Sequence, residues 1–266
     1  MINLQSSFSD FNETSNRFKS IIRGCHILLK NACIAQTHYQ YIKKRISDLG
    51  INNFEVGYFP PAEYIDYILD FVSEEILQQT GILFIKEILN RGNIQKNYYN
   101  FFEKHNIIIP NYNEYGDIVS ISGRTILSDD EMKENKIQKY KNAVYSKSLY
   151  LYGLHRAKKA IILNDCVYIV EGQIDCIACH NNGIYNCVAI TGSSLSRYQF
   201  NLLLRLTNNL ILILDNDVAG RKACNKIHKE YGKYCNIMEV KIPDEYNDVD
   251  IYLKKNSPNF ASMITT

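Results

Sequence analysis

The chain lacks the features of an exported or membrane-bound protein. The segment from Met1 to Phe18 is polar and has no apolar signal-peptide core, and no apolar run approaches the length of a membrane span. We therefore expect a cytoplasmic protein without a membrane partner. Tryptophan is also absent, and together with the abundant Asn, Ile, Lys and Tyr this composition is typical of an AT-rich genome.

A disulfide framework is missing too, although the chain has eight cysteines. Cys166, Cys187 and most of the others sit within apolar runs, which suits reduced, buried thiols. The segment Cys176–His180 spells the C-x-x-C-H pattern of c-type haem attachment. It lies on a predicted helix, however, whereas haem attachment needs an exposed loop in an exported chain. We expect packed thiols there, and neither haem nor zinc as a cofactor.

The first half of the chain is predicted to be mainly helical. With 266 residues, 46% of them hydrophobic, the chain can bury a substantial core and divide into two subdomains. Apolar residues recur every three or four positions from Ser20 to about Asn100, with one helix expected over Tyr64–Gln79. Two short strands follow, joined in hairpin fashion, at Ile107–Ile109 and Ile118–Ser122. This pattern predicts a polar leader at 1–19 and a mixed α+β, largely helical subdomain at 20–160.

The second half alternates between strands and helices. Strands are expected at Val167–Val170, Cys187–Ile190, Leu210–Leu214 and Ile237–Val240. Helices are expected between them, at 174–181, 197–206 and 218–231. The alternation predicts an α/β domain with a parallel four-stranded sheet flanked by helices, over residues 161–256, followed by a tail at 257–266.

Acidic residues gather at the expected carboxyl edge of this sheet, where ligands bind in open α/β folds. Asp215 and Asp217 come directly after an apolar strand, and side chains two residues apart on an extended chain point the same way. At about 4 Å and an effective dielectric near 20, two such charges repel by roughly 4 kcal/mol, a cost that a divalent cation removes. Glu171 follows another strand, and Asp248 and Asp250 come soon after the last one.

Helix capping is the competing interpretation of these acids. Asp217 and Asp248 each precede an expected helix, and for a single acid capping is the favoured explanation. Capping does not account for Glu171, which follows a buried strand and precedes a glycine. It also leaves unexplained why acids occur in pairs, at Asp215 and Asp217 and at Asp248 and Asp250. Carboxylates from three strand ends, beside small residues, are what a magnesium and phosphate site requires.

A basic segment separates the two halves. Residues 133–160 hold eight lysine or arginine residues against one acid, and tyrosines are interleaved with them. Grooves for single-stranded nucleic acid combine basic and aromatic groups in this way, although a solvated surface has a similar charge.

The acidic motifs resemble the successive motifs of the Toprim fold: Glu171–Asp175, Thr191–Ser193, Asp215–Arg221 and Asp248–Asp250. Upstream segments resemble the RNA polymerase domain of bacterial DnaG-type DNA primases: Tyr41–Arg45, Gly57–Pro61, Thr80–Leu83, Ile109–Pro110, Asn113–Val119, Ser122–Arg124, Lys139–Asn142 and Lys147–Leu154. The resemblance spans roughly residues 20 to 256. No segment upstream of residue 20 matches the family's zinc-binding domain, which suggests a short phage, plasmid or mobile-element version.

The resemblance implies a DNA primase catalytic core. Such a nucleotidyltransferase, a DNA-directed RNA polymerase, makes short RNA primers for DNA replication on single-stranded DNA from nucleoside triphosphates, with Mg²⁺ or Mn²⁺ as cofactor. The catalytic residues would be Glu171, Asp215, Asp217 and Lys147. The metal ligands would be Glu171, Asp215, Asp217, Asp248 and Asp250. Nucleotide and DNA would contact Arg124, Lys139, Lys147, Lys104 and Lys141; at Lys104 the family's basic pair is incomplete, since His105 and Asn106 follow.

The expected partners are single-stranded DNA, nucleoside triphosphates and either a replicative helicase or a separate zinc-binding subunit. Two alternatives stay open. One is a Toprim-type nuclease or topoisomerase-related protein, which would cut or relax DNA without nucleoside triphosphates. The other is a catalytically silent module that binds single-stranded nucleic acid, against which the intact acids argue.

Overall fold

The computed structural model of the chain describes residues 4–90, 93–143, 145–243, 245–246, 248–256, 260 and 264–265. The chain divides into two compact units. The first unit comprises Met1–Lys44, Ile51–Asn111 and Ile118–Tyr145, and the second unit comprises Arg45–Gly50, Tyr112–Asp117 and Ser146–Thr266. The chain passes between the units several times, and its last passage from the first unit to the second follows Tyr145. The sequence placed a boundary at 160. Within the described ranges, no helix combines the length and the hydropathy needed to cross a bilayer.

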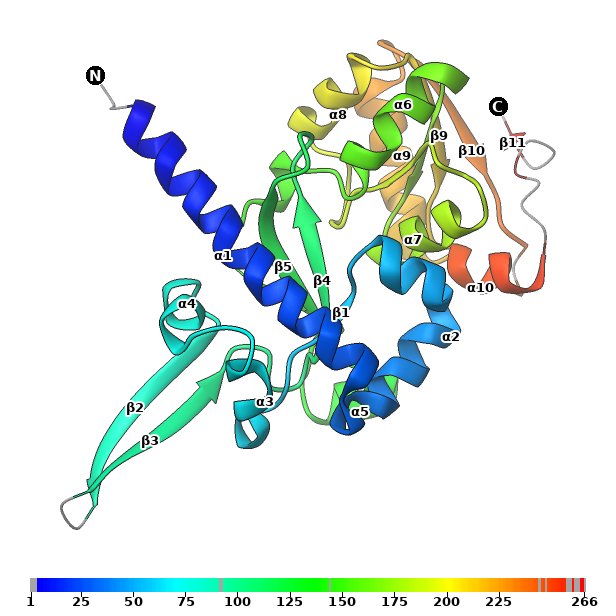
Figure 1. Cartoon of the computed structure of the whole chain (residues 1–266). Helices are drawn as coiled ribbons and strands as arrows, with labels where there is room; N and C mark the ends of the chain where they lie inside the picture. Colours follow the sequence, from blue (N-terminus) through cyan, green and yellow to red (C-terminus); the bar gives the residue numbers. More distant parts are fainter. Residues whose placement is uncertain are drawn as a thin grey trace. The chain divides into compact units, whose positions relative to one another are not determined.

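The first unit combines helices with a small sheet (Figure 1). Its helices are α1 (Leu4–Asn31), the greater part of α2 (Gln36–Asn53), α3 (Asp66–Leu69), α4 (Glu74–Gln79) and α5 (Asp129–Glu134). Its strands are β1 (Gly57–Tyr58), β2 (Leu83–Asn90), β3 (Asn93–Asn100), β4 (Ile107–Tyr112), β5 (Ile118–Arg124) and β6 (Tyr140–Asn142). The sheet order is β1-β4-β5-β6. The two strands predicted near Ile107 and Ile118 are confirmed as β4 and β5.

Helix α1 packs against β1 and β5 through one apolar face. Ile21, Ile22 and Cys25 of this face are at most 1% exposed. The backbone of β1 approaches the helix closely, because a Cβ on Gly57 would lie 2.5 Å from the Cβ of Cys25. Glycine at this position therefore lets the strand lie directly on the helix.

The prediction of helix as far as Asn100 is wrong. Strands β2 (Leu83–Asn90) and β3 (Asn93–Asn100) pair antiparallel, in register from Leu83↔Asn100 to Asn90↔Asn93. Aromatic cross-strand pairs such as Phe84↔Tyr99 favour strands, and they outweigh an apolar spacing that also fits a helix. The single helix expected over Tyr64–Gln79 is wrong as well, since α3 ends at Leu69 and Ser73 caps a separate α4 by accepting a hydrogen bond from the Ile76 N–H.

The second unit is the predicted α/β domain. Its elements are α6 (Leu154–Asn164), β7 (Val167–Val170), α7 (Gln173–Asn181), β8 (Cys187–Ala189), α8 (Arg197–Leu204), β9 (Asn209–Ile213), α9 (Val218–Tyr231), β10 (Asn236–Val240), α10 (Val249–Lys255) and β11 (Ile264–Thr265). Strands β8-β7-β9-β10 are parallel, which confirms the prediction of a four-stranded parallel sheet. The structure adds β11, which pairs antiparallel with β10 and falls in the segment expected to be a tail.

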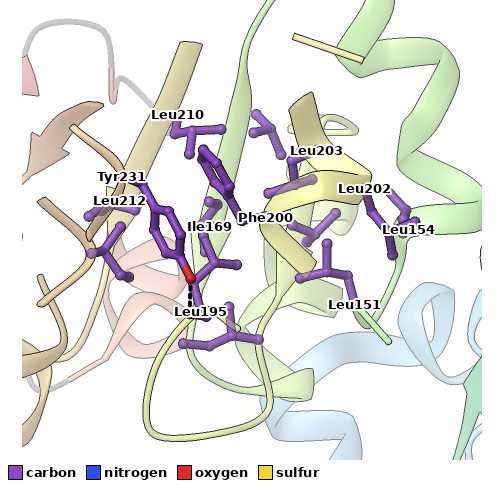
Figure 2. Packing of buried hydrophobic residues seen from close by; sticks show 14 of the residues in the cluster. Leu151, Leu154, Ile169, Leu195, Phe200, Leu202, Leu203, Leu210, Leu212 and Tyr231 are labelled. Atoms are coloured by element: carbon purple, nitrogen blue, oxygen red, sulfur yellow. Dashed lines mark hydrogen bonds between the residues drawn. The ribbon is translucent and has the colours of Figure 1, made fainter. Parts of the chain in front are cut away.

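The core of the second unit lies between this sheet and its helices. Figure 2 shows the cluster, in which Leu210 and Leu212 of β9 face Phe200 of α8 and Tyr231 of α9. Burial of each large apolar side chain contributes about 1.5–3 kcal/mol. Apart from Tyr168 and the first residue of β9, Asn209, the residues of β7 and β9 are apolar. The acidic residues appear only where these strands end.

Candidate active site

Glu171 and Asp215 leave the sheet side by side. The register of β7 and β9 sets Val170 opposite Ile213, so both acids follow at the same edge. The backbone N–H of Asp215 donates a hydrogen bond of 3.1 Å to Oε1 of Glu171. Burial raises the pKa of Glu171, and the nearby charge of Asp217 raises it further against the effect of that hydrogen bond. The site therefore favours a cation that would keep Glu171 ionised.

Asp217 caps α9, as the competing interpretation predicted. Its Oδ1 accepts a hydrogen bond of 2.7 Å from the Gly220 N–H, and the side chain is exposed. Gly220 packs so closely that an added Cβ would lie 2.9 Å from Glu171 Oε1 and would collide with the Asp215 carbonyl oxygen. The cap uses one carboxylate oxygen, so it does not exclude a ligand role for Asp217. It also holds the first turn of α9 close to Glu171 and Asp215.

A second acidic group combines Asp175 at the start of α7 with Asp248 and Asp250 at the start of α10. One carboxylate oxygen from each lies within 4.8 Å of the other two, a spacing that could hold a metal ion. Asp248 occupies the N-cap position of α10 but makes no side-chain cap hydrogen bond. Sequence reasoning did not select Asp175, although it is the last residue of the Glu171–Asp175 motif and follows Glu171 by four residues.

The pKa values of the three acids in this group are shifted in different directions. Burial raises the pKa of Asp175 well above its usual range, and the charges of Asp250, Asp248 and Asp215 add to this effect. Burial and a hydrogen bond with Asp250 raise the pKa of Asp248 to about 6. Burial also opposes ionisation of Asp250, yet the hydrogen bond from Asp248 and the charges of Arg45 and Lys254 hold its pKa below the usual value. Asp250 is thus the ionised member of a crowded group.

Arg45 is a further residue that sequence reasoning did not select for the site. Its Nη2 donates a hydrogen bond of 2.6 Å to Asp250 Oδ1 and lies 3.5 Å from Asp248 Oδ2. Just after Arg45, helix α2 is interrupted at Ser47 (φ 57°, ψ 174°). The Asn181 amide donates to the carbonyl of Ile46 there, which anchors the segment on α7. The only sequence signal was that Arg45 ends the family-like segment Tyr41–Arg45.

Lys147, expected to be catalytic, begins a single 3₁₀ turn over Lys147–Leu149 in the second unit. Its backbone carbonyl accepts a hydrogen bond of 3.2 Å from the Gln199 amide. Burial lowers the pKa of its ammonium group. No ion pair joins this ammonium group to an acid within the described part of the chain, so the structure does not bring Lys147 into direct contact with the acidic groups.

The other basic residues of the prediction lie in the first unit. Lys104 and Lys141 line one pocket of about 370 Å³, and the Lys141 Nζ lies 4.1 Å from the ring centroid of Phe101. Arg124 is only 3% exposed, because its guanidinium donates to the hydroxyls of Tyr140 (2.6 Å) and Tyr41 (3.0 Å). Lys139, which directly precedes Tyr140 in the sequence, is exposed.

Two protein families match the chain, one in each half. The family described as the N-terminal domain of the DNA primase catalytic core matches residues 26–158, and a Toprim-like family matches residues 168–253. DNA primases of Lactococcus lactis and Aquifex aeolicus are each 29% identical to this chain, over 231 and 218 residues. The alignments cover 84% and 81% of this chain but 34% and 42% of those proteins, so the chain spans less than half of their length.

Solved structures agree with these matches. The Aquifex aeolicus primase, in a structure of its zinc-binding and RNA polymerase domains, is 27% identical with a TM-score of 0.73, covering 92% of this chain and 58% of that chain. A DnaG primase catalytic domain bound to single-stranded DNA shares the fold with a TM-score of 0.73 at 24% identity, covering 96% of this chain and 81% of that chain. The half-chain family match and the Toprim-like sheet lead to one assignment: this chain belongs to the family of DnaG-type DNA primase catalytic cores.

Proposed function

We propose that the chain acts as the catalytic core of a DNA primase, which synthesises short RNA primers on single-stranded DNA from nucleoside triphosphates. The observation that carries this proposal is the convergence of acids at one edge of the Toprim-like sheet. The relatives named DNA primase support it, as does the related catalytic domain bound to single-stranded DNA. A nuclease or topoisomerase role, or a silent binding module, has no comparable support.

The acidic residues fit a divalent metal ion. Their donors are carboxylate oxygens, which suit Mg²⁺ and Mn²⁺. Oδ1 of Asp248 is buried and has no hydrogen-bond partner within the described residues, so a cation would satisfy it. We place the metal ligands at Glu171, Asp215, Asp217, Asp175 and Asp248. When bound, the metal would neutralise the triphosphate and lower the pKa of the attacking hydroxyl.

Asp250 takes a different part in this proposal from the one that the sequence suggested. Both of its carboxylate oxygens already contact cations. Arg45 contacts Oδ1 through Nη2 and Oδ2 through Nε, and Lys254 Nζ lies 3.0 Å from Oδ2. We infer that Asp250 serves chiefly as the ionised anchor of Arg45. Arg45 then holds Asp248 in place, so that the buried carboxylate keeps one oxygen directed to the metal.

Basic residues would bind the phosphates. The pocket of Lys104 and Lys141 combines three lysines, the third being Lys136, with Phe101 and a single acid, Glu103. This combination is expected for a site that binds a nucleotide or a nucleic-acid strand. Lys139 and Lys147 would add electrostatic contacts, and Arg124 would need Tyr41 or Tyr140 to move before it could reach a phosphate. Such contacts predict salt-sensitive binding with little sequence preference. A cytoplasmic location and a helicase or zinc-binding partner stay part of the proposal.

The test is incorporation of labelled nucleoside triphosphates on single-stranded DNA with Mg²⁺ or Mn²⁺. A second reaction starts from an RNA primer already annealed to the template, which removes the need for start-site recognition by another chain. Asp215→Asn should abolish incorporation in both reactions, whereas Asp129→Asn, an exposed acid on α5, should leave it unchanged. Equal incorporation by wild type and Asp215→Asn would refute the mechanism. Cleavage or relaxation of plasmid DNA without nucleoside triphosphates would favour the nuclease or topoisomerase alternative.

A further inference from the structure

A second basic and aromatic pocket lies in the second unit, where α8 and α9 meet. Its volume is about 620 Å³, within the range of roughly 300–1,000 Å³ that is usual for ligand sites. The loop before α8, the α8 helix and the C-terminal end of α9 line it. None of the proposed metal ligands borders this pocket, so it is separate from the acidic site.

Positive charge is in excess around the pocket. Its lining holds four basic side chains and one acid, Glu230. Lys226 and Glu230 form an exposed ion pair of 3.9 Å, which contributes little. Arg197 and Lys229 are exposed and have no ion-pair partner within the described residues. These two cations are therefore available to an anion from outside the chain.

The floor of the pocket is aromatic. Phe200 and Tyr231 stack with ring centroids 4.0 Å apart, and both are buried. Figure 2 shows the two rings side by side, with the Tyr231 hydroxyl donating to the Leu195 carbonyl oxygen at 3.3 Å. A platform that is stacked and hydrogen-bonded already has its geometry before a ligand arrives.

Tyr234 offers an accessible ring beside this floor. Its side chain is 54% exposed, and its ring centroid lies 6.4 Å from that of Phe200. The Nζ of Lys233 lies 4.9 Å from the Tyr234 centroid, so a cation and an aromatic face occur together. Exposed lysines alone are usually a solvated surface. Here they line a pocket together with an accessible ring, and proteins that bind nucleic-acid strands use this combination to hold phosphates and stack bases.

We propose that this pocket binds a segment of single-stranded DNA. Phosphates would contact Arg197, Lys229 and Lys233, and one base would stack on Tyr234. The choice of DNA among polyanions rests on the proposed function, since the template of a primase is a single DNA strand. The pocket would then hold template on the α8 and α9 side of the sheet, in addition to the contacts proposed for the first unit.

The experiment measures binding without catalysis. Fluorescence anisotropy follows a labelled oligothymidylate of about 16 nucleotides over a salt series, with a chelator present and no nucleoside triphosphates. Each lost phosphate contact reduces the salt slope for a single strand by about 0.7, so Arg197→Ala/Lys229→Ala should reduce it by about 1.4. Tyr234→Ala should weaken binding about fivefold or more with the slope unchanged, and Tyr234→Phe should bind like wild type.

The control is Lys159→Ala, which removes an exposed lysine of α6 in the same unit and should change neither affinity nor slope. Unchanged thermal melting of every variant excludes misfolding as the cause. If Arg197→Ala/Lys229→Ala binds with the affinity and salt slope of wild type, the proposal that this pocket binds DNA is refuted. It is also refuted by tighter binding of oligouridylate than of oligothymidylate, or by binding confined to an oligoglutamate peptide, which would indicate an acidic protein partner.

The pocket and the proposed function fail in different ways. Asp215→Asn should bind oligothymidylate with the wild-type slope while losing primer synthesis. If the pocket variants bind DNA like wild type while the wild type synthesises primers, the result counts against the pocket proposal alone. If the wild type synthesises no primers while the pocket variants bind DNA more weakly than wild type, the result counts against the proposed function.

Discussion

Arg45 grips both carboxylate oxygens of Asp250, with Nε 2.5 Å from Oδ2 and Nη2 2.6 Å from Oδ1. The Asp250 side chain is fully buried, so this pair compensates a charge that water cannot reach. The same guanidinium lies 3.5 Å from Asp248. Arg45 therefore contributes both to the stability of the second unit and to the positions of the acidic side chains.

Arg45→Ala should lower the free energy of unfolding by about 3–5 kcal/mol, because it removes the more buried of the two cations that contact a fully buried carboxylate. Lys254→Ala is the matched control: its Nζ contacts the same carboxylate but is more exposed, and we expect a smaller loss. Urea denaturation measures both. A loss in Arg45→Ala no larger than that in Lys254→Ala would contradict the role given to Arg45.

Gly220→Ala should disrupt the acidic site more than the fold. Alanine in a helix is usually more stable than glycine by about 1 kcal/mol, but here its Cβ would press on Glu171 and the Asp215 backbone. A displacement of about 1 Å can reduce the rate of primer synthesis by about a hundredfold. Ala219→Gly, at the neighbouring exposed position, should lower stability and leave the rate unchanged. A Gly220→Ala enzyme with wild-type activity would show that this close approach is dispensable.

Stability without metal should depend on pH through Asp248. Its pKa is raised from 3.8 to about 6 in the folded state, so ionisation costs more in the folded chain than in the unfolded one. The protonated group therefore favours folding below about pH 4, and this contribution is lost as pH rises through 6. The loss is at most about 3 kcal/mol.

Asp248→Asn should remove that part of the pH dependence. Urea denaturation in the presence of a chelator, between pH 4 and pH 7, gives the difference between the two proteins. Asp175 acts in the same direction, so a smaller decline is expected to persist in the variant. Parallel pH profiles for the variant and wild type would contradict the raised pKa of Asp248.

Lys104→Ala and Lys141→Ala should weaken template or nucleotide binding. Each removes one cation from the same pocket, so each should raise KM with little change in kcat and reduce the salt slope for a single strand by about 0.7. Lys133→Ala, an exposed lysine on α5 outside the pocket, serves as the control. A fall in kcat at constant KM would instead assign these lysines to the chemical step.

The sequence was informative where local pattern and topology agree. In the second unit, apolar runs such as Leu210–Leu214 mark buried strands, and alternation with helices brings their acidic ends to one edge. The β2–β3 hairpin was missed because its exposed apolar residues, among them Phe84 and Leu89, give no simple alternation. Arg45 was missed for a different reason, since its partner Asp250 is 205 residues away and no local pattern encodes that contact.

Strand β11 has a consequence for self-association. A parallel sheet presents unpaired backbone groups at each edge, and such edges can recruit strands from other molecules. Here β11 covers β10 at one edge, and Tyr152 exchanges two backbone hydrogen bonds with Ala189 of β8 at the other, at 2.9 and 3.0 Å. A chain shortened before Ile264 would uncover β10, and we expect it to aggregate by edge-to-edge pairing at concentrations where the full chain stays dispersed.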